Sequence, residues 1–404
     1  MAIGYPKRSC AIELFDTDVS SSNPFPVKNG LGDLVLDAWG TPKVTQPFTL
    51  FHSVWTFDVS PKLWIKSENG SEVNSSTRIV SEYSMLKVSS GSSLNSYSNA
   101  YSKRHPRYQP NRGHLFSTAV YLPNKTAAGQ RDFGLFSEEN GVFFRLKSDG
   151  KMYAVLRNNS IDVKEELITP SFNVDYEKGN IYDIQFQWRG VGNYKFFIGD
   201  PDTGASKLVH MFDILGTSTS LSINNPALPV CYQSTNKGSE VVIYSGCCDV
   251  TSEGGSDEKQ YYTSSILLGK TINTNTPILA IRQPDTINGK INTRDILLSR
   301  VTINASKKSS VGMFVTRDAT AISGGSWSAI QNSYVEENST ISSVDFTKMS
   351  QVTVFSCEAG VSKETTNPNK DIIQFWLVRG DCLVLVGNGA GALVDAVIEF
   401  GEEI

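Results

Sequence analysis

Apolar and polar residues alternate along much of the chain, and the alternation is clearest between residues 114 and 199. The apolar runs RDFGLFS, GVFFRLK and KMYAVLRN are separated by the dipeptides Asn140-Gly141 and Asp149-Gly150. Such dipeptides are strong hairpin signals, because type I′ turns need positive φ at both central residues. This stretch therefore predicts a meander of three antiparallel strands.

A further strand signal follows at residues 182–188, YDIQFQW, where apolar and polar residues alternate strictly. Ile184, Phe186 and Trp188 would lie on one face, which is typical of a half-buried antiparallel strand. A glycine-rich turn then leads into the next apolar run, YKFFIGD. Short strands at regular spacing with frequent turn signals predict a β-sandwich.

The pattern divides the chain into two β-rich regions. Residues 1–30 consist of loop-forming residues and predict an irregular N-terminal arm, and residues 31–255 predict a lectin-like β-sandwich. Residues 256–275, which begin in a polar, glycine-rich boundary loop, are interpreted as a linker. Residues 276–404 have the size of a second sandwich. We therefore expect an all-β protein with two antiparallel β-sandwich (jelly-roll or lectin-like) domains.

Charge and cysteine content narrow the classes of partner. The 37 lysines and arginines against 41 acidic residues leave a net charge of −4, so the chain has no global attraction for nucleic acid or an anionic membrane. No stretch approaches 18 uninterrupted apolar residues, so we expect no membrane-spanning helix. The six cysteines lack CxxC spacing and the N-terminus lacks the apolar run of a signal peptide. We expect free thiols in a reducing cytoplasm.

Local motifs for catalysis, metals or cofactors are missing from the sequence. The four histidines lack metal-site spacing, and no GxSxG nucleophile motif is present. A glycoside hydrolase needs two carboxyl groups, but the polar face of the YDIQFQW strand carries Asp183 with two amides, Gln185 and Gln187. An amide neither ionises nor donates a proton in this role. We therefore predict a non-enzymatic protein with no cofactor and no metal site.

The most polarised segment is KRHPRYQPNR, residues 103–112, a stiff and positively charged loop. One interpretation is a contact for an acidic neighbouring protein, a glycan or nucleic acid. The other is that its arginines pair with carboxylates of the same domain, such as those near Glu138 or Asp183. The candidate interaction loop consists of Lys103, Arg104, His105, Arg107, Tyr108 and Arg112.

Several stretches carry a family resemblance in a fixed order. They are DAWGTPK at 37–43, RYQPNRGHLFSTAVYLPNKT at 107–126, FGLFSEENGVFFRLKSDGKMYAVLR at 133–157, GNIYDIQFQWRGVGNYKFFIGD at 179–200 and NPALPV at 225–230. In this order the sequence resembles a family of virion structural proteins of large tailed bacteriophages and other large DNA viruses. The likeness covers about residues 30–300. It implies a head decoration, fibre, collar or tail component, with no catalytic residues.

We therefore expect a non-enzymatic virion structural protein that assembles, in the host cytoplasm, through its sandwich domains and N-terminal arm. Its expected partners are other copies of itself and other virion proteins, because neutral polar surfaces suit symmetric assembly. Nucleic acid and membranes are not expected partners. The alternative is a carbohydrate-binding host-attachment protein of the particle, whose sandwich binds host glycans. A polysaccharide-degrading enzyme is the third hypothesis.

Overall fold

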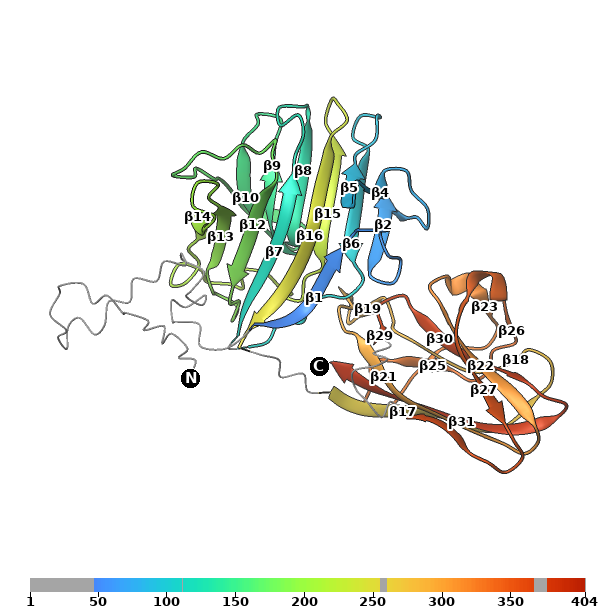
Figure 1. The fold of residues 1–404 in the computed structure, drawn as a ribbon. Helices are drawn as coiled ribbons and strands as arrows, with labels where there is room; N and C mark the ends of the chain where they lie inside the picture. The colour runs from blue at the N-terminus through green and yellow to red at the C-terminus, as the bar shows by residue number, and fades with distance from the viewer. Residues whose placement is uncertain (1–46, 111, 255–259, 367–375, 404) are drawn as a thin grey trace, which may run out of the picture.

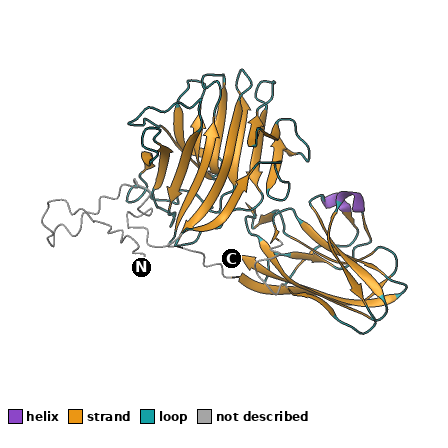
Figure 2. Ribbon diagram, viewed as in Figure 1, coloured by secondary structure: helices purple, strands orange, loops and turns teal. Residues whose placement is uncertain are grey.

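The computed structural model describes residues 47–110, 112–254, 260–366 and 376–403, and these fold into two antiparallel β-sandwiches (Figures 1 and 2). The prediction of an all-β, two-sandwich architecture is confirmed. Short 3-10 helices at Ala319–Ala321 and Phe346–Lys348 interrupt the strands of the second sandwich. The predicted N-terminal arm, residues 1–30, lies outside the described residues, as do residues 31–46 of the predicted first domain.

The first sandwich consists of two eight-stranded sheets. One sheet, called sheet A here, is ordered β14(Ser206–Phe212), β13(Tyr194–Gly199), β12(Asn180–Phe186), β7(Gly113–Tyr121), β16(Val242–Glu253), β5(Met85–Ser89) and β4(Ile79–Glu82), with β1(Phe48–Val54) also paired to β16. The other, sheet B, is ordered β11(Ile161–Leu167), β10(Met152–Asn158), β9(Gly141–Leu146), β8(Gly129–Phe136), β15(Val230–Asn236), β6(Tyr97–Ser102), β2(Trp64–Glu68) and β3(Ser71–Glu72). The strands β8, β9 and β10 form the predicted meander, because each pairs antiparallel with the next.

An aromatic core fills the space between sheets A and B. Ile184 and Phe186 point into it from β12, as the alternation predicted, and Trp188 packs against its edge. Phe133 and Phe144 stack with ring centroids 5.4 Å apart, and Tyr182 meets Phe133 edge-on at 4.9 Å. Large buried rings contribute much of the apolar area that stabilises a sandwich of this size.

The second sandwich has a five-stranded and a six-stranded sheet around its own aliphatic core. Sheet C is ordered β17(Gln260–Ile272), β31(Ala392–Glu403), β21(Ile296–Ala305) and β28(Lys363–Thr366), with β29(Trp376–Leu377) also paired to β21. Sheet D is ordered β24(Ser328–Ala329), β25(Glu336–Asn338), β18(Thr276–Arg282), β30(Cys382–Asn388), β22(Ser309–Thr316) and β27(Ser350–Cys357). Two separate two-stranded sheets pair β19(Thr286–Ile287) with β20(Lys290–Ile291) and β23(Ile322–Ser323) with β26(Ser343–Val344).

The structure differs from the prediction at residues 256–275, which were interpreted as a linker. Residues 260–272 form the long strand β17, which pairs with β31 from Gln260↔Glu403 to Ile272↔Ala392. This strand belongs to the second sandwich. Its pairing partner lies more than a hundred residues away in sequence, so no local turn signal marks it.

Candidate functional site

The candidate interaction loop begins at the joint between the two sandwiches. Arg104 places its Nε 3.2 Å from Oδ2 of Asp295, and its guanidinium lies 4.1 Å from the ring centroid of Trp376. Both partners belong to the second sandwich, and Asp295 is only 1 % exposed. The acidic group that Arg104 contacts therefore lies in the other domain of the same chain. The hypothesis that the loop arginines pair within the chain named carboxylates of the first domain, so for Arg104 the partner differs from the one predicted.

A second ion-pair cluster spans the same joint. Arg317 of the second sandwich places Nε 2.9 Å from Oε2 of Glu72 in the first, and Nη1 3.1 Å from Oδ1 of Asp381. Tyr101 donates its hydroxyl to Oε1 of Glu72 at 2.9 Å. Burial opposes ionisation of Glu72, but the Arg317 guanidinium outweighs it and lowers the pKa of that carboxyl. Glu72 therefore stays charged and holds the two domains together at neutral pH.

Four of the remaining loop residues divide between the joint and the first sandwich. Lys103 is partly buried near the joint, and this burial lowers the pKa of its ammonium group. Burial together with the nearby Arg379 lowers the pKa of His105 to about 3, so this histidine is neutral. Tyr108 and Arg112 instead serve the first sandwich, because the Tyr108 hydroxyl accepts the backbone N–H of Arg189 at 3.1 Å and Arg112 donates to the carbonyl of Gly254.

Arg107 differs from its neighbours in the loop. Its Nη1 is buried and has no hydrogen-bond partner among the described residues. The structure thus brings Lys103, Arg104 and His105 close to the second sandwich, whereas Tyr108 and Arg112 contact the first. Contact of this loop with another protein, a glycan or nucleic acid stays a prediction.

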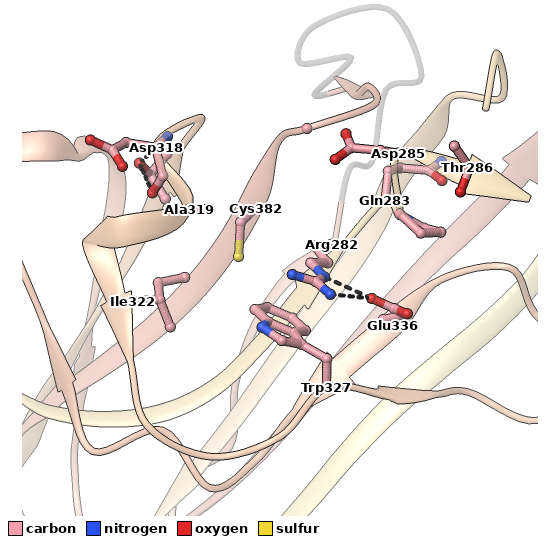
Figure 3. Close-up of a pocket in the computed structure, with 13 residues that line it drawn as sticks. Arg282, Gln283, Asp285, Thr286, Asp318, Ala319, Ile322, Trp327, Glu336 and Cys382 are labelled. Atoms are coloured by element: carbon pink, nitrogen blue, oxygen red, sulfur yellow. Dashed lines mark hydrogen bonds and ion pairs between the residues drawn. The ribbon is translucent and has the colours of Figure 1, made fainter. Parts of the chain in front are cut away.

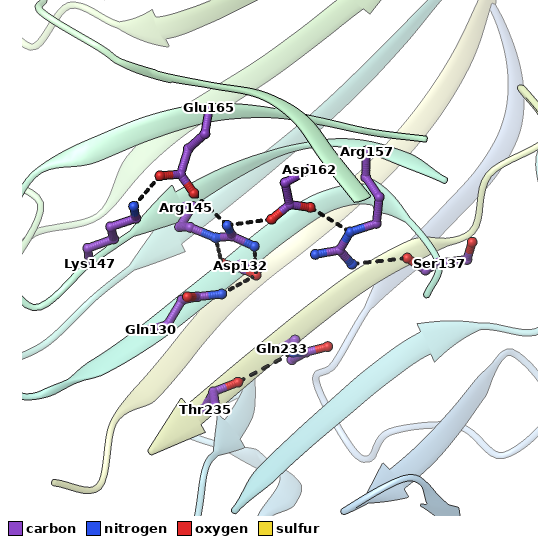
Figure 4. A network of polar contacts seen from close by, with 10 residues as sticks. All are labelled: Gln130, Asp132, Ser137, Arg145, Lys147, Arg157, Asp162, Glu165, Gln233 and Thr235. Carbon is purple, nitrogen blue, oxygen red and sulfur yellow. Dashed lines mark hydrogen bonds and ion pairs between the residues drawn. The ribbon is translucent and has the colours of Figure 1, made fainter. Parts of the chain in front are cut away.

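A network of buried charges crosses the outer face of sheet B (Figure 4). Arg145 donates to both carboxylate oxygens of Asp132, at 3.0 and 2.9 Å, and its Nη1 lies 2.7 Å from carboxylate oxygens of both Asp162 and Glu165. Arg157 donates to the other oxygen of Asp162 at 2.7 Å. Since the side chain of Arg145 is only 6 % exposed, these contacts replace its lost hydration.

The charges of this network stabilise the fold and are poorly suited to acid–base catalysis. Burial opposes the charged forms of Asp162 and Glu165, but hydrogen bonds from the surrounding cations outweigh it and lower the pKa of both carboxyl groups. A carboxyl group with a lowered pKa is a poor proton donor at neutral pH. The network therefore attaches the edge strand β11 to its neighbours and makes a poor acid–base pair.

A row of polar side chains on the outer face of sheet A contains a carboxylate that sequence reasoning missed. Asp183 on β12 and Asp249 on β16 both pair in register with Ser117 on β7, so the two carboxylates share one face. Partial burial and the charge of Asp183 raise the pKa of Asp249. The alternation of Asp249, Thr251 and Glu253 was the available signal, but only the strand order places it beside β12.

The spacing of Asp183 and Asp249 resembles that of the two catalytic carboxyl groups of a glycosidase, but Asp183 is not accessible to a substrate. Strands two positions apart are roughly 9–10 Å apart, close to the separation of the carboxyl groups in inverting glycosidases. Asp183, however, is only 3 % exposed and accepts the Ser206 hydroxyl at 2.5 Å. A polysaccharide could not reach both carboxylates in this conformation. The absence of enzymatic activity stays a prediction.

A pocket of about 280 Å³ opens at one end of sheet D (Figure 3). It forms where β18 and β22 end and β30 begins, among connecting segments of the second sandwich. The lining residues are Arg282, Gln283, Pro284, Asp285, Thr286, Thr316, Asp318, Ala319, Ile322, Trp327, Glu336, Gly380 and Cys382.

Among the described residues, Trp327 is the one large aromatic side chain that lines this pocket. The guanidinium of Arg282 lies 4.3 Å from its ring centroid and is held there by Glu336, whose Oε2 accepts from both Nε and Nη2 at 2.7 Å. The indole also packs against a small apolar cluster that includes Ala280 and Val384. Asp285 and Asp318 lie across the pocket from it (Figure 3). The pocket thus combines a fixed aromatic ring with several carboxylate acceptors.

No pattern in the sequence marks Trp327 as a site residue. It lies in the segment GGSWS, residues 324–328, which shows no strand alternation, and its pocket partners come from distant strands. A large aromatic residue in a glycine- and serine-rich loop was the one available signal, because such loops run over the surface. Within the described residues no group of three or more histidine, cysteine or acidic side chains is placed to hold a metal ion. The described part of the chain contains no helix long and apolar enough to span a membrane.

Comparison with known proteins gives matches of fold at about 10% identity. No protein-family model and no curated protein sequence matches the chain. A solved endo-acting O-glycanase of the human gut microbiota matches with 10% identity and a TM-score of 0.39, covering 51% of this chain and 99% of that one. The potassium-bound carbohydrate recognition domain of Emp46p matches with 9% identity and a TM-score of 0.35, covering 51% and 98%. A β-1,3-glucanase from Mycobacterium marinum matches with 11% identity and a TM-score of 0.37, covering 51% and 100%.

Proposed function

We propose that this chain is a carbohydrate-binding attachment protein of a virus particle, and that the pocket beside Trp327 is its sugar site. The assignment to a particle rests on the family resemblance of residues 30–300. The single observation that supports sugar binding is the pairing of a partly exposed indole with carboxylate acceptors around a pocket of about 280 Å³.

Each part of the pocket matches a chemical feature of a sugar ring. The face of an indole carries negative partial charge, so it attracts the weakly positive C–H groups on the flat side of a pyranose. Carboxylates accept hydrogen bonds from hydroxyl groups, and such charge-assisted bonds are stronger than neutral ones. Asp285 and Asp318 are exposed residues at the pocket, where they can accept from hydroxyl groups of a bound sugar. The ion pair between Arg282 and Glu336 fixes the guanidinium against the indole, so the ring is oriented before a ligand binds.

Replacement of Trp327 by alanine should weaken sugar binding about 30-fold or more, because truncation of an anchoring aromatic residue typically costs about 2 kcal/mol or more. Glycan-array screening of the full chain identifies a ligand, and titration calorimetry then measures its dissociation constant for each variant. Trp327→Phe keeps an aromatic face and should retain part of the affinity.

Tyr334 offers a matched control on the same sandwich. The guanidinium of Arg294 lies 4.0 Å from the Tyr334 ring centroid, so this pair copies the aromatic–arginine stack without lining the pocket. Tyr334→Ala should leave sugar affinity unchanged. The proposal fails if the wild-type chain binds no glycan, or if Trp327→Ala binds as well as wild type while remaining folded by circular dichroism.

A second candidate function, a structural particle component, is favoured by exposed apolar side chains on the outer face and edge of sheet C. Ile266 and Leu268 on the edge strand β17 are 55% and 69% exposed, and Leu393 on β31 is 49% exposed. Exposed apolar groups on neighbouring strands are typical of surfaces that bind other protein copies. Sedimentation of the purified chain tests this candidate, since a strict monomer at high concentration would count against it.

A further inference from the structure

We infer that the pocket beside Trp327 selects neutral sugars and rejects sugars that carry a carboxylate or sulfate. This inference rests on the proposed function, because it concerns the ligand of the same pocket. The inference rests on three observations: the charged side chains at the pocket are mostly acidic, hydrogen bonds keep Asp318 ionised, and the pocket has room for about one sugar ring.

The charged groups that line the pocket are predominantly acidic. Among the described residues that line it, three carboxylates, Asp285, Asp318 and Glu336, face one cation, Arg282, so this part of the lining carries a formal charge of 1 − 3 = −2. That cation is already paired with a carboxylate. Nε and Nη2 of Arg282 both lie 2.7 Å from Oε2 of Glu336, and its guanidinium lies against the indole of Trp327.

Asp318 keeps its negative charge at neutral pH. The Thr320 hydroxyl and backbone N–H donate to Oδ1 at 2.6 and 2.8 Å, and these bonds lower the pKa of the carboxyl. Two cations lie just outside the lining. Lys348 places Nζ 3.4 Å from Oδ2 of Asp318 and offsets part of this charge. Arg317, beside Gly380, is paired with Glu72 and Asp381. Counting Lys348, the formal charge is still 1 + 1 − 3 = −1. An incoming sugar carboxylate therefore meets net repulsion, whereas a neutral hydroxyl meets acceptors.

The size of the pocket confines this selection to one sugar ring. Its volume of about 280 Å³ lies just below the range of roughly 300–1,000 Å³ typical of small-molecule sites. A single terminal ring can enter, while the rest of a longer glycan stays outside. We therefore expect the charge of the terminal sugar, and not the charge of the whole glycan, to decide binding.

The decisive experiment compares matched sugars that differ only in one group. Titration of the full chain with methyl galactoside and methyl galacturonoside, and with methyl glucoside and methyl glucuronoside, isolates the effect of a carboxylate. We expect the acidic member of whichever pair binds to bind at least tenfold more weakly at low salt. The difference should shrink as salt is raised, because ions screen exposed charges.

Charge removal at the pocket tests the physical cause. The double variant Asp285→Asn with Asp318→Asn keeps the side-chain shapes and should narrow the neutral-to-acidic ratio to less than threefold. The matched control, Asp202→Asn with Glu358→Gln, removes two exposed charges that do not line the pocket and should leave the ratio unchanged. Trp327→Ala is measured in parallel to show that binding occurs at this pocket.

The outcomes separate the two proposals. Equal binding of neutral and acidic sugars, lost for both in Trp327→Ala, would overturn the neutral-sugar inference and leave the proposed function standing. A neutral-to-acidic ratio unchanged in Asp285→Asn with Asp318→Asn would likewise overturn the inference. If no sugar binds, or binding is unaffected in Trp327→Ala, the proposed function itself is wrong.

Discussion

Replacing Arg145 by methionine is expected to destabilise the first sandwich by about 3–5 kcal/mol, since it leaves buried carboxylates without their counter-charge. Asp132 is 1 % exposed and receives two hydrogen bonds from Arg145. Methionine fills a similar volume, so the loss reports mainly the missing charge. Native-state hydrogen exchange of peptides from β9 and β10 measures the change in the free energy of local unfolding.

An exposed ion pair of the same sandwich supplies the control. Lys87 lies 2.7 Å from Glu82 with both side chains partly solvated, and Lys87→Met should cost less than about 1 kcal/mol. Adding Asp132→Leu to Arg145→Met should recover part of the lost stability, because it removes the unpaired buried charge. A cost below 1 kcal/mol for Arg145→Met alone would show that the network does not stabilise sheet B.

Reversing the charge of Arg104 is expected to separate the two sandwiches. Arg104→Glu places a carboxylate beside Asp295, which is 1 % exposed, and removes the stack on Trp376. Loss of one partner of a buried ion pair costs about 2–5 kcal/mol at an interface. Combined with Arg317→Ala, which removes the contact with Glu72, the change should increase the radius of gyration measured by small-angle X-ray scattering.

A charge swap distinguishes a specific pair from general damage. Arg104→Asp with Asp295→Arg restores opposite charges and should recover part of the compact scattering profile. Lys178→Glu, a charge reversal at a side chain that is 78% exposed, should leave the profile unchanged. If Arg104→Glu with Arg317→Ala scatters like the wild-type chain, these ion pairs do not hold the joint.

For the candidate interaction loop, the charge pattern predicted a contact surface but not its partner. Four cations within residues 103–112 marked the segment as a contact surface. The carboxylate that Arg104 contacts lies 191 residues farther along the chain. No local pattern links two such positions, because their proximity depends on how the two sandwiches pack.

The pocket beside Trp327 was not predicted for a related reason. Its aromatic ring lies in a glycine- and serine-rich loop, and its carboxylates come from connections between different strands. The same holds for Asp249, which enters the row of Asp183 only because β7 lies between β12 and β16. Sites assembled from several strands require the strand order, which sequence alternation does not specify.

Interactions between residues close in sequence were sufficient to predict the fold class. Side-chain alternation and Asn-Gly or Asp-Gly turns act over a few residues, so the meander β8–β10, the core face of β12 and the all-β character were predictable. Long-range pairing decided the rest. The strand β17 in the supposed linker, the partner of Arg104 and the pocket around Trp327 each depend on contacts between distant segments. Such contacts form only when burial of apolar surface fixes one arrangement of the sheets, and this arrangement determines which polar groups meet.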